Sequence, residues 1–168
     1  MRLLLALLAV GLPNLAVAAP LPATLSPPGK PLFEAKSPEE AAITLKRLSS
    51  QPFLEVLQRL ANERGFGQAV NGRFRGEKVS DRRVRIIIEG VEADKLRLLE
   101  QALTDMVTGK TPENDRQRLI IVYQEMKRRH ERLEQIGGRL PPNFLEQERT
   151  RLESYQNEIN PPILRKLR

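Results

Sequence analysis

The pattern of apolar and polar residues predicts one central strand at about residues 83–89. Alternate side chains of a strand point to opposite faces of the sheet. The residues that would share one face are all apolar: Val84, Ile86 and Ile88. The opposite face would carry Arg85, Ile87 and Glu89. We therefore expect helices mainly on the apolar face, with the mixed face left for a partner or for the C-terminal helical hairpin.

Two amphipathic helices are predicted before this strand, over residues 37–49 and 52–65, because apolar residues recur there at helical spacing. The first begins with a capping-box pattern. Ser37 can accept a hydrogen bond from the first turn, Pro38 suits the first helical position, and Glu40 completes the box.

A third helix is predicted directly after the strand, with Asp94 as its N-cap and Gly109 as its stop. Its apolar side consists of Leu96, Leu99, Leu103 and Met106. The strand, a tight turn and this helix then form one unit, in which the helix folds back onto the apolar face of the strand.

Residues 66–78 are rich in glycine and show no helical periodicity. The Asn71-Gly72 pair is a strong hairpin signal, so we expect a short edge strand or hairpin that pairs with the central strand. A phosphate-binding loop is the alternative interpretation. It is disfavoured because the glycines are not placed between a strand and the N-terminus of a helix.

The last third of the chain predicts two helices that form an antiparallel hairpin over residues 110–160. Apolar residues recur at helical spacing up to a breaker loop at residues 137–142, and Asn143 with Glu146 favours a second helix start. Residues 118–123 could instead form a strand, because four apolar residues and a tyrosine follow one another there. The unbroken helical phase favours the long helix.

The first 18 residues have the pattern of a cleaved signal peptide. A short basic start precedes an apolar run, and Ala16-Val17-Ala18 offers a cleavage site. A retained membrane anchor is the alternative. The expected organisation is a signal peptide (1–18), a Pro-rich flexible leader (19–36), an α/β core (37–109), a helical hairpin (110–160) and a basic tail (161–168). The predicted fold class is α+β and helix-rich, with a small antiparallel sheet of two or three strands.

Composition narrows the candidate functions. The chain has no cysteine, which excludes disulfides, thiolate metal sites and cysteine nucleophiles. It has 28 basic and 21 acidic residues and carries a formal net charge of +7. A basic exported protein is attracted to anionic polymers, lipid head groups and acidic proteins. Nucleic acid is a disfavoured partner because the chain has no tryptophan and few other aromatic residues on which bases could stack.

The sequence singles out no catalytic residue, no cofactor and no metal site. His130 is the only histidine, so histidine clusters are excluded. No nucleophile turn of the Gly-x-Ser-x-Gly type is present. A cell-wall hydrolase with paired carboxylates is retained as the third functional hypothesis, although no glutamate stands out.

The candidate contact residues for a partner or an anion are basic. They form a cluster in the first helix of the hairpin and a group at the end of the tail: Lys127, Arg128 and Arg132, and Arg165, Lys166 and Arg168. We expect a non-enzymatic accessory or assembly subunit of the cell envelope that binds another protein through the hairpin and the tail. The alternative is a binder of an anionic polymer or a membrane surface. The expected location is the periplasm, an equivalent extracytoplasmic compartment or the medium.

The order helix, glycine-rich hairpin, Ile-rich strand and helix over residues 52–106 resembles the small α/β modules that gate outer-membrane secretion channels and receptors. The segment at residues 76–82 is read as a linker, which would be longer than such a module needs. The resemblance therefore assigns no functional residue.

Overall fold

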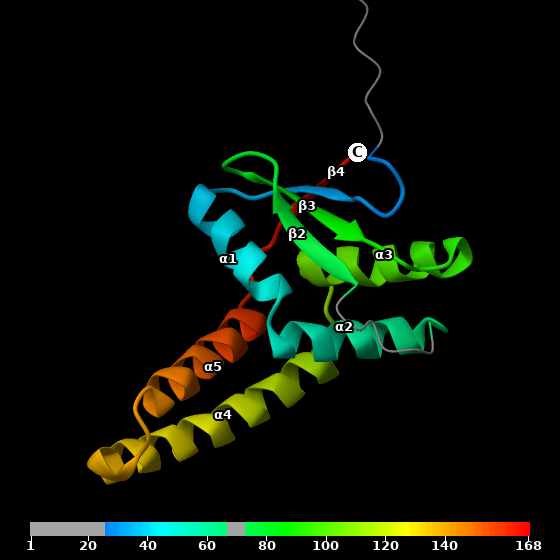
Figure 1. The fold of residues 1–168 in the computed structure, drawn as a ribbon. Coiled ribbons are helices and arrows are strands. Elements are labelled where there is room, and N and C mark those ends of the chain that lie inside the picture. Colours follow the sequence, from blue (N-terminus) through cyan, green and yellow to red (C-terminus); the bar gives the residue numbers. More distant parts are fainter. Residues whose placement is uncertain (1–25, 67–72) are drawn as a thin grey trace, which may run out of the picture.

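The computed structural model describes residues 26–66 and 73–168 (Figure 1). The predicted signal peptide, the first part of the leader and the Asn71-Gly72 pair lie outside the described residues. None of the helices in the described ranges is long and apolar enough to cross a membrane.

The fold is α+β and helix-rich, with one four-stranded antiparallel sheet, which confirms the predicted fold class. The strands are β1 (Leu32–Glu34), β2 (Phe74–Lys78), β3 (Arg83–Ile88) and β4 (Arg165–Leu167), in the order β2-β3-β1-β4. The helices are α1 (Pro38–Leu48), α2 (Gln51–Glu63), α3 (Ala93–Val107), α4 (Glu113–Ile136) and α5 (Phe144–Ile159), with a short 3-10 helix η1 (Gly137–Arg139) between the last two.

Strand β3 is central, as its alternation predicts, but two further strands come from segments expected to lie outside the sheet, the flexible leader and the basic tail. The end of the predicted leader forms β1, which pairs with β3. The predicted basic tail forms β4, which pairs with β1. Each of these strands has only three residues, too few for an alternation pattern to be recognised. The flexible leader was therefore wrongly extended over residues 32–34, and the strand within the basic tail was not predicted.

The predicted pairing of the glycine-rich region with the central strand is confirmed by β2, although the connecting turn lies elsewhere. Strands β2 and β3 are joined at residues 79–82, where the amide of Val79 donates to the carbonyl of Arg83 at 2.9 Å. The segment at residues 76–82 is thus half strand and half turn, and it was wrongly read as a linker. Gly76 lies inside β2, where α1 packs closely against the strand. A Cβ at this position would come within 2.7 Å of the Leu45 and Leu48 side chains, so glycine fits where a larger residue would require these side chains to move.

The hydrophobic core lies between the sheet and the helices, which are on one side of the sheet (Figure 1). The alternate residues Val84, Ile86 and Ile88 of β3 belong to this core. Phe53 of α2 packs against Phe74 of β2 with ring centroids 5.8 Å apart. The two faces of the sheet therefore differ, as the alternation predicts.

The predicted N-cap residues agree only in part with the N-caps in the structure. Ser37 caps α1, and its hydroxyl accepts a hydrogen bond from the amide of Glu40 at 3.3 Å. The Glu40 carboxylate accepts from the amide of Lys36 rather than from that of Ser37. Helix α3 begins one residue earlier than Asp94, with Glu92 at the N-cap position. Asn143 precedes α5 as predicted, but its side chain makes no cap hydrogen bond.

Helices α4 and α5 form the predicted hairpin, which projects away from the sheet (Figure 1). Residues 118–123 are helical, so the long-helix interpretation is confirmed. Gly137 has a positive φ of 43° where α4 ends, a conformation that glycine adopts at little cost.

Candidate binding surfaces

A buried ion pair fixes the base of the hairpin to the body of the molecule. Arg47 of α1 donates from Nε to Oε2 of Glu158 at 2.6 Å and from Nη2 to Oε1 at 2.9 Å. The two side chains are 0% and 1% exposed. The guanidinium also lies 5.1 Å from the centroid of the Phe53 ring. This bidentate, water-excluded pair joins α1 to α5.

A second ion pair fixes the other helix of the hairpin. Arg59 of α2 lies 2.7 Å from Oδ1 of Asp115 at the start of α4, and the Asp115 side chain is 2% exposed. Burial raises the pKa of Asp115, the charge of Arg59 opposes this rise, and the charge of Glu63 adds to it. Each helix of the hairpin is thus tied to a different helix of the body, which fixes the direction in which the hairpin projects.

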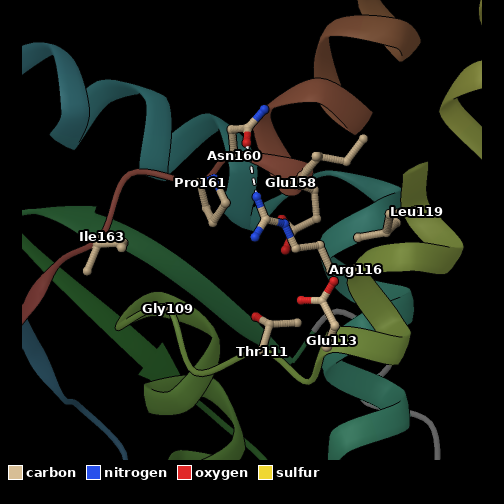
Figure 2. Close-up of a pocket in the computed structure, with 10 residues that line it drawn as sticks. Gly109, Thr111, Glu113, Arg116, Leu119, Glu158, Asn160, Pro161 and Ile163 are labelled. Atoms are coloured by element: carbon tan, nitrogen blue, oxygen red, sulfur yellow. Dashed lines mark hydrogen bonds between the residues drawn. The ribbon is translucent and has the colours of Figure 1, made fainter.

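A pocket of about 390 Å³ lies at this base (Figure 2). It is formed by the α3–α4 connection, the start of α4, the end of α5 and the segment that follows α5. Arg116 reaches from α4 to Asn160 after α5, with its Nη2 donating to Oδ1 at 3.3 Å (Figure 2). Two carboxylates, of Glu113 and Glu158, line the pocket.

These two carboxylates do not form an acid–base pair of the kind that glycoside hydrolysis needs. Both oxygens of Glu158 accept hydrogen bonds from Arg47. Burial raises the pKa of Glu158, but the hydrogen bonds and charge of Arg47 act in the opposite direction. Glu113 is exposed and accepts from Gln117 at 2.6 Å. A hydrolase needs two carboxyl groups free to meet substrate and water, whereas Glu158 serves as a structural anion.

Metal-binding clusters are not found in the described ranges, where no three histidine, cysteine or acidic side chains come together. His130 is half-buried on α4, with its Nε2 3.3 Å from Oε1 of Glu134. It is the only histidine in the chain, so no second imidazole can join it as a metal ligand.

The far end of the hairpin carries apolar side chains that the two helices cover only in part. We call Leu133, Ile136, Leu140 and Phe144 the hairpin tip. Ile136 is 51% exposed, and the other three are half-buried. Each of the two helices covers only the side that the other turns toward it. Apart from the connecting η1, no further helix or strand lies beside this end of the hairpin in the described structure (Figure 1). The tip is therefore an apolar surface on a rigidly anchored arm.

The predicted basic contact residues fall into two separate groups. Lys127, Arg128 and Arg132 are exposed on α4, in the half of the hairpin that is far from the sheet. Arg165 and Lys166 belong to β4, and Arg168 follows it. Lys166 pairs with Glu100 of α3 at 3.3 Å, so it holds β4 against the body instead of forming part of a free arm.

Sequence reasoning missed the residues that anchor the hairpin. Arg47 and Glu158 are 111 positions apart, and each lies in a helix with many other charged residues. The available signal was weak: Arg47 directly precedes the apolar Leu48 and so lies close to the buried side of α1. Charge alone indicated a solvated position, and only the packing of α5 on α1 places the pair inside the protein.

Comparisons of this chain with protein-family models, with curated proteins and with solved structures found no match.

Proposed function

We propose that this chain is a non-enzymatic accessory or assembly subunit of the cell envelope that binds another protein through the hairpin tip. One observation carries the proposal: the hairpin is fixed at its base by one buried charge pair and by a second pair in which the aspartate is buried, yet its tip exposes apolar side chains. An anchored arm loses little conformational freedom on binding, which favours its use as a docking element.

The surroundings of the tip favour a protein partner. Lys127, Arg128 and Arg132 flank it, and Glu131 and Glu134 are interleaved with them. An apolar centre with an ionic rim of both signs is the usual anatomy of a protein interface. A binder of an anionic polymer or of a membrane surface would gain from an unbroken cationic stripe, and this part of α4 has none. The signal-peptide pattern of residues 1–18 supports export.

Two exposed isoleucines on α4 provide a matched test of the tip. We expect Ile136→Ser combined with Leu140→Ser to abolish recovery of the partner from envelope extract, because the substitutions remove the apolar contact. Ile121→Ser should leave recovery unchanged, since Ile121 is 57% exposed but lies outside the tip. Partners captured by the wild-type chain are identified by mass spectrometry, and circular dichroism checks the fold of each variant.

Ionic strength separates the two classes of partner. Binding through the apolar tip should change little with salt, whereas binding to an anionic polymer falls steeply as salt rises. The proposal fails if the tip variant recovers the same protein as the wild type. A steep salt dependence would instead support the polymer-binding alternative.

A further inference from the structure

The face of the sheet that points away from the helices is rich in arginine. Register places six basic side chains on it: Lys30, Arg73, Arg75, Arg83, Arg85 and Arg165. Three acidic side chains lie among them, Glu34, Glu77 and Glu89, which leaves an excess of three positive charges. We call this surface the open sheet face. No helix covers it in the described part of the chain (Figure 1).

The centre of the open sheet face is apolar. Leu32 of β1 lies between Leu167 of β4 and Arg85 of β3 in the register. Leu32 and Leu167 are half-buried, and Ile87 is 8% exposed although it lies outside the core cluster between sheet and helices. The surface therefore combines apolar side chains at the centre with guanidinium groups around them.

Most of these cations lack a strong partner within the protein. The ion pairs Arg75–Glu89 and Arg83–Glu34 have N–O distances of 3.7 and 3.8 Å and are exposed, so they contribute little to stability. Lys30 and Arg165 have no ion-pair partner among the described residues, and the Nε of Arg85 is buried without a hydrogen bond. Lys30 and Arg165 are exposed, so their donors are available to a ligand.

We infer that the open sheet face binds an acidic, amphipathic protein segment, at a second site separate from the hairpin tip. Guanidinium groups bind carboxylates in a planar, bidentate manner, and the apolar centre matches the apolar side of such a segment. The interleaved glutamates would repel a uniformly charged polymer or an anionic lipid surface. Single-stranded nucleic acid is disfavoured because the described residues of this face include no aromatic side chain on which bases could stack.

A synthetic amphipathic helix of leucine and glutamate is the probe, and inorganic polyphosphate is the comparison ligand. Arg75→Glu with Arg165→Glu reverses two exposed charges on the open sheet face. Arg128→Glu with Arg132→Glu makes the same change of charge on the hairpin. We expect the first variant to weaken peptide binding by at least about tenfold and the second to change it by less than about twofold.

Chemical-shift mapping with the wild-type chain gives a measurement that does not depend on the folding of any variant. The peptide should shift the amide signals of β1, β3 and β4 and leave those of the hairpin tip in place. The inference is overturned if the shifts map to the hairpin, or if both charge-reversal variants weaken peptide binding equally. It is also overturned if polyphosphate binds as tightly as the peptide and shifts the same signals.

Discussion

At the scale of single residues, buried charge decides how the hairpin is held. Arg47 and Glu158 lose nearly all contact with water and pair with each other through two hydrogen bonds, although the Nη1 of Arg47 is buried without a partner. Such a pair gives little net stability over apolar residues of the same size, but it does not tolerate the loss of one partner. Its value lies in fixing the position of α5 against α1.

We predict that Arg47→Met lowers the free energy of unfolding by about 3–5 kcal/mol, because it leaves the Glu158 carboxylate buried without a counter-charge. Urea denaturation measures the loss. The double variant Arg47→Met with Glu158→Leu should recover most of it, since no unpaired charge remains.

Lys46→Met serves as the control for this prediction. Lys46 and Glu153 also join α1 to α5, but their side chains are 62% and 51% exposed at a distance of 3.7 Å. Lys46→Met should change the free energy of unfolding by no more than about 0.5 kcal/mol. Equal losses in Arg47→Met and Lys46→Met would show that burial of the pair is not what matters.

At the scale of elements, local sequence sets where helices begin, and the hydrogen bonds of the N-cap residue set how well each helix start is stabilised. Helices α1 and α2 follow one another, each with a serine at the N-cap and a proline in the first turn. Only Ser37 accepts a hydrogen bond from its helix, whereas Ser50 makes no side-chain cap bond, and its buried Oγ has no partner. The same residue type thus stabilises one helix start and not the other.

We predict that Ser37→Ala destabilises the protein by about 1 kcal/mol, because the amide of Glu40 loses its acceptor. Ser50→Ala should be close to neutral, since no hydrogen bond is lost. Thermal and urea denaturation of both variants measure the difference. A larger loss in Ser50→Ala than in Ser37→Ala would contradict the assigned caps.

At the scale of the whole molecule, segments near the two ends of the described chain complete the sheet as the neighbouring strands β1 and β4. Strand β1 lies between β3 and β4, so residues near the start and the finish of the described chain pair directly. Leu164, just before β4, is 2% exposed in the core, and its amide donates to the carbonyl of Val107 at the end of α3 at 3.0 Å. The final segment is therefore packed against the body of the protein as part of the fold.

We predict that removing residues 163–168 lowers the free energy of unfolding by about 2–5 kcal/mol, the cost of losing a buried leucine and its packing. Removing Arg168 alone should have little effect, because this residue is exposed and follows the strand. Urea denaturation of the two shortened chains distinguishes the outcomes. If the longer truncation is as stable as the intact chain, β4 does not contribute to the sheet as described.

The elements that the sequence predicted well are those with a strong local pattern. Strand β3 follows from the alternation around Ile86, and α1 follows from Ser37 and Pro38. The hairpin of α4 and α5 was also predicted, because its apolar seam repeats over many turns. For the proposed surfaces, sequence located the basic residues of α4 and left the mixed face of the central strand for a partner. It found neither the apolar tip nor the side chains that β1, β2 and β4 add to the open sheet face.

The sequence by itself determined the elements whose cause lies within a few residues: helical spacing, caps, glycine stops and one alternating strand. The tertiary structure alone decided that residues 32–34 and 165–167 become strands, because a three-residue strand exists only through its neighbours. It also decided that Arg47 is buried with Glu158 and that Arg85 and Arg165 share one surface. These arrangements join positions far apart in the chain, and their energy comes from water exclusion and pairing that exist only after folding.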